Sequence, residues 1–352
     1  MTEQDTKTLD TEKSINDILN TIDREREREI ISRRFGLFER KETLEQIGEL
    51  LGITRERVRQ LEKAVLARLK ASAEQGNGVP HVKEVETQLV EVLGTTGNAA
   101  RISDLLTQFG LENTKLEQAR IAFLAQLCPA VTVIEEDDHH YLAAGLTSIH
   151  DQKAMKGLVS KIVSVVKELG KPAPIEQIAK QANIDDPKQA AALASISKRL
   201  ATLNGVWGLV SWPTVNPKNI RDKIYVILKE NGKHMHFNEI AEAIKESNFK
   251  RKDVTTQAIH NELIKDKRFV LVGRGIYALK EWGYQKGTVA DIIADILRKE
   301  GGALHRDEIV KRVLQSRYVK ETTILLNLQG KPQFKRVAKA TYTLDEQVEP
   351  EA

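Results

Sequence analysis

The sequence predicts a mainly α-helical protein in which one helix-turn-helix is followed by tandem modules, each with three helices and a short β-hairpin. Apolar residues recur at helical spacing through most of the 352 residues. Glycines fall where helices should end, and one pattern of helix, glycine and apolar residue occurs four times. An apolar fraction of 41% is enough for packed cores, and an aromatic fraction of 5% suits small helical domains.

The helix-turn-helix is predicted in residues 43–70. Apolar residues recur until Gly52 interrupts them, and Thr54 can then cap a second helix through its hydroxyl group. In this motif the start of the second helix enters the major groove of DNA, where arginine pairs with guanine, glutamine with adenine and glutamate with cytosine. On spacing alone, a two-helix hairpin with a solvated charged face is the less favoured alternative. The candidate base-reading residues are Arg55, Glu56, Arg59 and Gln60.

The residue identities in this segment are a more specific signal than the spacing of its apolar residues. TLEQIGELLGITRERVRQLEKAVLARL, together with the preceding REREREIISRRFGL, resembles region four of the sigma-70 family of bacterial transcription initiation factors. The resemblance implies a domain at residues 24–71 whose second helix reads a promoter −35 element. It also implies phosphate contacts by Thr43, Thr54 and Lys63. Only 23 residues precede the match, so we expect no upstream sigma region and no complete sigma factor.

The charge of the chain is distributed unevenly. Residues 1–23 carry 2 bases and 6 acids, and we expect them to form a disordered acidic tail. Residues 24–70 carry 13 bases and 9 acids, whereas residues 71–150 carry 4 and 11, which argues against phosphate binding there. Residues 216–285 are basic again, with 14 bases and 9 acids. Downstream modules are therefore the better candidates for additional phosphate contacts.

Several features indicate a cytoplasmic protein. The N-terminus lacks the apolar core of a signal peptide, and no stretch approaches the length of a membrane span. The single cysteine, Cys128, excludes an internal disulfide bond and lies in an apolar run, so we expect it in a core. We expect localisation at the nucleoid and no contact with membranes.

A pattern of helix, glycine and, eight positions later, an apolar residue occurs four times after a polar linker at residues 72–81. A third helix and a β-rich stretch follow each time, which is typical of winged-helix modules. We expect each glycine to take the left-handed conformation beyond its helix, and the modules to fold as separate small domains. The glycine pairs are Gly97 with Leu105, Gly170 with Ile178, Gly232 with Ile240, and Gly301 with Ile309, and the predicted modules are residues 82–145, 155–212, 216–282 and 286–346.

The third module carries a second resemblance. The residues that resemble a HARE-type helix-turn-helix are Ile240–Ile244 in NEIAEAI, Asn261–Leu263 before DKRFVLVGRG, and Gly275–Leu279. That family includes the delta subunit of bacterial RNA polymerase and domains fused to restriction and chromatin proteins, and residues 286–346 look like a diverged relative. The resemblance implies association with nucleic acid or polymerase. Candidate secondary contacts are Lys250, Arg251, Lys252 and Arg274.

Nothing in the sequence predicts catalysis. Walker-type loops, CxxC pairs and HExxH motifs do not occur in it. His139 and His140 follow four acidic residues, and we interpret this run as a solvated hairpin tip rather than a metal site. We therefore expect no enzyme activity, cofactor, metal or small-molecule substrate.

Three functions remain open at this point. The first is a sequence-specific protein that binds double-stranded DNA in bacterial transcription initiation or its regulation. The second is an accessory subunit that docks on the RNA polymerase core through the apolar face of residues 24–51. The third is the DNA-recognition module of a restriction or modification system, with a nuclease supplied by a partner.

Overall fold

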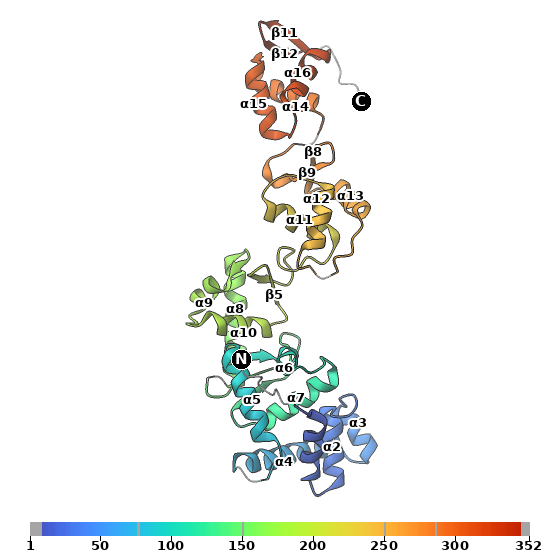
Figure 1. The fold of residues 1–352 in the computed structure, drawn as a ribbon, viewed down its shortest axis with the longest axis vertical. Helices are drawn as coiled ribbons and strands as arrows, with labels where there is room; N and C mark the ends of the chain where they lie inside the picture. Colours follow the sequence, from blue (N-terminus) through green and yellow to red (C-terminus); the bar gives the residue numbers. More distant parts are fainter. Residues whose placement is uncertain (1–8, 76–77, 150, 250, 286, 346–352) are drawn as a thin grey trace, which may run out of the picture. The chain divides into compact units, whose positions relative to one another are not determined.

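The structure, a computed structural model, describes residues 9–75, 78–149, 151–249, 251–285 and 287–345 (Figure 1). The chain divides into two compact units, the first ending at Ser211 and the second beginning at Trp212. Helices predominate in both units, and the strands form small antiparallel sheets. The mainly helical fold class is therefore confirmed. Among the described residues, no helix is long and apolar enough to cross a membrane.

The helix-turn-helix forms where the spacing predicted it. The Thr43 hydroxyl accepts a hydrogen bond from Gln46 N, and the Gln46 side chain bonds back to Thr43 N, which makes a complete capping box. Gly52 ends the first helix with a φ of 63°, a left-handed conformation that favours glycine. Thr54 then caps the second helix by accepting from Arg57 N. The helices of this region are α1 (Thr11–Asn20), α2 (Glu25–Phe35), α3 (Leu44–Leu51) and α4 (Arg55–Glu74).

The first unit also contains two repeats with one topology. Each repeat runs helix, short strand, helix, helix and then a β-hairpin, and the last strand lies in the middle of a three-stranded sheet. The first repeat comprises α5 (Val82–Thr95), β1 (Ala99–Arg101), α6 (Ile102–Gln108), α7 (Lys115–Leu127), β2 (Val131–Ile134) and β3 (Ala143–Leu146). The second comprises α8 (Gln152–Leu169), β4 (Ala173–Pro174), α9 (Ile175–Ala182), α10 (Pro187–Ile196), β5 (Leu200–Leu203) and β6 (Val206–Leu209).

The second unit repeats this topology twice more. Its third repeat comprises α11 (Ile220–Asn231), β7 (Met235–His236), α12 (Phe237–Glu246), α13 (Thr256–Lys265), β8 (Phe269–Gly273), β9 (Ile276–Leu279) and the short 3-10 helix η1 (Lys280–Trp282). Its fourth comprises α14 (Val289–Glu300), β10 (Leu304–His305), α15 (Arg306–Ser316), α16 (Glu321–Gly330), β11 (Phe334–Ala338) and β12 (Thr341–Leu344).

The glycine prediction holds in the repeats. Gly170, Gly232 and Gly301 each follow the first helix of a repeat with φ between 63° and 69°. In the first repeat Thr96 is the C-cap, and Gly97 follows one residue later, also with a positive φ, of 94°. Gly97 also permits a close approach, because a Cβ atom there would lie 2.5 Å from the Lys188 carbonyl oxygen.

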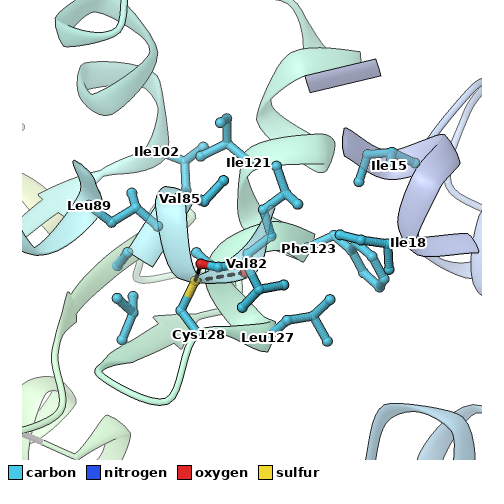
Figure 2. Close-up of a cluster of buried hydrophobic side chains, with 14 of the residues drawn as sticks. Ile15, Ile18, Val82, Val85, Leu89, Ile102, Ile121, Phe123, Leu127 and Cys128 are labelled. Atoms are coloured by element: carbon cyan, nitrogen blue, oxygen red, sulfur yellow. Dashed lines mark hydrogen bonds between the residues drawn. The ribbon is translucent and has the colours of Figure 1, made fainter. Parts of the chain in front are cut away.

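The expected acidic tail is wrong for the part of it that the structure describes. Residues 1–8 of the predicted tail lie outside the described residues, but α1 follows, with Ile15 and Ile18 fully buried. These side chains lie in the same cluster as Phe123 of α7 (Figure 2). The Thr11 hydroxyl also donates to Glu117, at 2.6 Å. Apolar residues at helical spacing therefore outweigh the acidic excess of this segment.

The predicted boundary between the helix-turn-helix and the first repeat does not separate two cores. Ile31, Leu37 and Leu69 of the helix-turn-helix region share one core with α1 and the first repeat. Cys128 is buried in this core, as predicted (Figure 2). The predicted linker at residues 72–81 begins inside a helix, since α4 continues to Glu74. A segment as short as residues 24–71 buries too little apolar surface alone, which explains why it shares a core.

The acidic run of the first repeat is exposed, as predicted, but the end of the run at His140 is buried against the second repeat. His140 is only 7% exposed, its backbone bridges Ser197, and its imidazole Nδ1 lies 2.9 Å from a carboxylate oxygen of Asp137. Glu136 pairs with Lys198 at 2.7 Å, which joins the hairpin to the second repeat. Sequence spacing could not show this, because the docking partner lies some 60 residues away.

Candidate nucleic-acid interface

A small core fixes the angle between α3 and α4. Ile30, Ile47 and Val58 are fully buried against one another and join α2, α3 and α4. Gly48 permits the close approach of the turn, because a Cβ atom there would lie 2.7 Å from the Ile53 carbonyl oxygen. The sequence analysis missed this glycine, although a glycine inside a helical pattern is the signal that would have revealed it. The turn therefore holds α4 in a fixed orientation.

The four predicted base-reading residues all lie on the exposed surface of α4. Arg55, Glu56, Arg59 and Gln60 are exposed, and no other element covers them among the described residues. They fall in the first two turns of the helix, directly after the cap at Thr54. This is the part of a recognition helix that approaches base edges. The structure thus brings the predicted residues together on one accessible surface.

Glu56 and Arg59 form a bidentate pair on this surface. Arg59 Nε and Nη2 donate to the two carboxylate oxygens of Glu56 at 2.9 and 2.7 Å. Gln60 Nε2 also donates to Glu56, at 3.4 Å. The hydrogen bond from Arg59 lowers the pKa of Glu56, and the same bond raises the pKa of Arg59. Both groups are therefore charged at neutral pH, and the guanidinium is oriented before any ligand arrives.

Three more residues were predicted to contact phosphate. Thr43 and Thr54 are exposed, and their hydroxyl oxygens accept backbone hydrogen bonds at 3.2 Å as helix caps. A hydroxyl group that accepts still has one hydrogen to donate, so capping is compatible with a phosphate contact. Lys63 is exposed one turn beyond Arg59. All three therefore lie near the base-reading surface, in positions suited to backbone contacts.

The structure adds two residues that the sequence analysis missed. Arg57 is exposed on α4 and donates to the Gln60 side chain at 3.4 Å. Glu45 of α3 pairs with Arg55 at 3.1 Å, with both side chains about two-thirds exposed, so water screens this pair strongly. The charged spacing of TRERVRQ could have indicated Arg57, whereas the Glu45 contact depends on the fold.

The candidate secondary contacts lie in the second unit, and Lys250 lies outside the described residues. Arg251 is exposed with a φ of 60°, and its carbonyl oxygen accepts from the Lys223 ammonium group at 2.5 Å. Lys252 is partly buried. Arg274 is exposed in the turn between β8 and β9, as the sequence predicted.

Comparison with known proteins identifies the motif. The exposed recognition helix, its capped turn and its small core define a DNA-binding helix-turn-helix. Residues 24–71 match the family model for sigma-70, region 4. The chain is also 42% identical over 59 residues to the RNA polymerase sigma factor SigA of Bacillus sp. That match covers 16% of this chain and 15% of the relative, so it concerns this segment alone. Sigma-70 region 4 is a DNA-binding module of bacterial transcription initiation.

Proposed function

We propose that this protein binds double-stranded DNA sequence-specifically in bacterial transcription initiation or its regulation. In this proposal α4 reads a −35-like element through Arg55, Glu56, Arg59 and Gln60, while Thr43, Thr54 and Lys63 contact phosphates. The carrying observation is that the first two turns of α4 present four exposed polar and charged side chains, while Val65 and Leu69 further along anchor the helix in a core. A surface that served only packing would not be left open in this way.

The geometry of Arg59 supports base reading. Glu56 accepts hydrogen bonds from Arg59 Nε and from one hydrogen of Nη2. The other edge of the guanidinium is formed by Nη1 and the second hydrogen of Nη2, and it has no recorded partner among the described residues. A bidentate contact with guanine needs two adjacent N–H groups at such an edge. Glu56 therefore orients Arg59 without blocking the edge that would read a base.

We further propose that the four repeats are winged-helix modules, with the third of the HARE type. The support is their shared order of elements and the central position of the last strand in every sheet. Their role would be to add backbone contacts or to bind the transcription machinery. In this proposal the protein is cytoplasmic and nucleoid-associated, has no enzyme activity, and needs no cofactor or metal.

A paired titration tests the proposal. A preferred duplex is first selected from random DNA, and each variant is then titrated against that duplex and against a scrambled one. Arg59→Ala should lose about 1 to 3 kcal/mol on the preferred duplex and much less on the scrambled one. Lys63→Ala, an exposed site on the same helix, is the matched control and should weaken both equally. An unchanged ratio for Arg59→Ala would rule out base reading by this helix.

A second candidate function is docking on the RNA polymerase core. The apolar face of residues 24–51 was expected to serve this purpose, but Ile30 and Ile47 fill the core of the motif, and Ile31 packs with the first repeat. Leu50 of α3 is 55% exposed, so the docking hypothesis is favoured for α3 rather than for the whole of residues 24–51. If α3 docks on the polymerase, Leu50→Glu should abolish capture of the core enzyme and leave binding to the preferred duplex unchanged.

A further inference from the structure

The four β-hairpins are equivalent in topology but differ in charge. We count each from the first residue of its first strand to the last residue of its second. The β2–β3 hairpin has four acidic residues and no lysine or arginine, and the β5–β6 hairpin has neither kind. The β8–β9 hairpin has one base, Arg274. The β11–β12 hairpin has three bases and no acid, and its bases are Lys335, Arg336 and Lys339.

The acidic hairpin shows what such charges do within this chain. Glu136 of its loop pairs with Lys198 at 2.7 Å, and Asp137 pairs with Lys156 at 2.9 Å. Both lysines belong to the following repeat, so the hairpin uses its charge to bind a complementary surface. The pKa of Asp137 is held well below its ordinary range, chiefly by the hydrogen bond from Lys156.

The basic hairpin has no corresponding partner in the described part of the chain. Lys335, Arg336 and Lys339 are exposed, and no recorded ion pair involves them. Arg336 Nε donates only to the Ala338 carbonyl oxygen, at 3.2 Å. Asp345 follows the hairpin directly, and its backbone N–H bonds to Gln333. Three positively charged side chains on one hairpin therefore face solvent, and no acidic partner is recorded for them in the described part of the chain.

We propose that the hairpin Phe334–Leu344 binds the phosphates of duplex DNA. A two-stranded ribbon is narrow enough to enter a DNA groove. Lys335 and Arg336 lie in β11 and Lys339 lies in the turn that follows it, and the three residue steps from Lys335 to the end of the strand span about 10 Å. Duplex DNA carries one charge per about 1.7 Å of its axis, so this span faces several phosphates. The inference deepens the proposed function, because the same duplex would be held by α4 and by this hairpin.

The apolar content of the hairpin favours DNA over an acidic protein. Protein interfaces are usually anchored by exposed aromatic side chains at their centre. Here the aromatic residues Phe334 and Tyr342 face inward and are each only 7% exposed. Val337, at the bulge of β11, is the large apolar side chain of this hairpin that solvent reaches, at 51%. The exposed surface is thus charge without an apolar anchor, which suits a polyanion.

The test uses the full chain with Lys335→Gln, Arg336→Gln and Lys339→Gln combined. Its affinity is measured on the preferred and scrambled duplexes across a salt series. Both affinities should fall together, by roughly 10- to 100-fold at moderate salt, and the salt slope should decrease by about 2.7 for three lost contacts. A control variant, with glutamine at the exposed Lys245, Lys299 and Lys311, removes equal charge and should change neither quantity comparably.

Two further measurements make the outcome decisive. Lys335→Arg with Lys339→Arg keeps the charge and should retain wild-type binding, and thermal unfolding establishes that every variant is folded. The glutamine variant is also made in an Arg59→Ala background. A loss of affinity for the scrambled duplex in that background supports DNA binding by the hairpin even if α4 reads no bases. Wild-type affinity and salt slope in the glutamine variant would overturn the proposal, and an acidic protein surface would become the partner to seek.

Discussion

The two halves of α4 pack into different cores although they form one continuous helix. In the first half, Arg55 and Arg59 are exposed, and Val58 is the residue that packs inward. In the second half, Val65 and Leu69 are almost fully buried in the core shared with α1 and the first repeat. The comparison shows how a small motif is held rigidly: one half presents charged side chains to solvent while the other anchors them to a larger core.

Ion pairs join both halves of α4 to α2. In the second half, Arg68 Nη2 lies 2.7 Å from a carboxylate oxygen of Glu27, whose side chain is only 6% exposed. Toward the end of the first half, Glu62 pairs with Arg34 of α2 at 3.2 Å, beyond the exposed residues Arg55 to Arg57, Arg59 and Gln60. Substitutions in the second half should therefore change stability, whereas those of the exposed residues in the first half should change binding.

The largest effect is expected from Leu69→Ala. Leu69 is 4% exposed, so truncation leaves a cavity in the shared core and should destabilise the protein by about 2 to 5 kcal/mol. Denaturant unfolding at equilibrium measures this change. Leu50→Ala, at a 55% exposed leucine of α3, is the matched control and should cost far less. Equal losses in the two variants would mean that the second half of α4 is no anchor.

Arg120→Ala should cost somewhat less, about 2 to 3 kcal/mol. Arg120 is 5% exposed, and it donates to the Leu37 carbonyl oxygen, Glu117 and Glu12 at 2.9 to 3.0 Å. Its removal leaves a buried carbonyl group and the largely buried Glu117 without their cation. Hydrogen exchange of the α4 amides, read alongside denaturant unfolding, should show faster opening of the second half.

A double-mutant cycle sharpens this prediction. The side chain of Glu12 is 63% exposed, so its coupling to Arg120 should be small, whereas the coupling of Glu117, at 16%, should be larger. If Glu12→Gln and Glu117→Gln coupled equally to Arg120→Ala, burial would not determine the strength of this network.

These contacts separate what the sequence could predict from what it could not. Thr54, Gly52 and the three glycines that end helices act within one turn of the chain, so their spacing was a sufficient signal. The anchor of α4 depends on Phe123 and Leu37, which are far apart in sequence, and no local pattern encodes their meeting. A signal for α1 was present in Ile15, Ile18 and Leu19, but the acidic composition of the segment concealed it.

The candidate site follows the same division. Exposure of Arg55, Glu56, Arg59 and Gln60 could be predicted because helical periodicity separates the apolar face of α4 from its charged face. The Glu56–Arg59 pair is also local, since residues three apart on a helix are neighbours. Docking of the acidic hairpin onto Ser197 and Lys198 was not predictable, because charge composition alone does not identify a partner.

A smaller effect is expected from Thr54→Ala, which removes the cap between the turn and the first half of α4. The Thr54 hydroxyl accepts from Arg57 N at 3.2 Å, and loss of such a cap costs about 1 kcal/mol. Thermal unfolding should detect the loss, and Thr54→Ser should restore most of it because serine caps equally well. If Thr54→Ala unfolded as wild type does, another group would be satisfying the exposed amides of this turn.

The smallest effect concerns the protonation of Glu56. Hydrogen bonding from Arg59 lowers its pKa in the folded chain. The stability contributed by the pair is therefore fully present above the ordinary glutamate pKa and is lost only as the pH falls through the lowered value. A carboxyl titration followed by NMR should place Glu56 below ordinary glutamates, and Arg59→Ala should return it toward them. Lys63→Ala, on the same exposed face, should leave the titration unchanged. An unshifted Glu56 in the wild-type protein would mean that Arg59 is not held in the orientation on which our proposal of guanine reading depends.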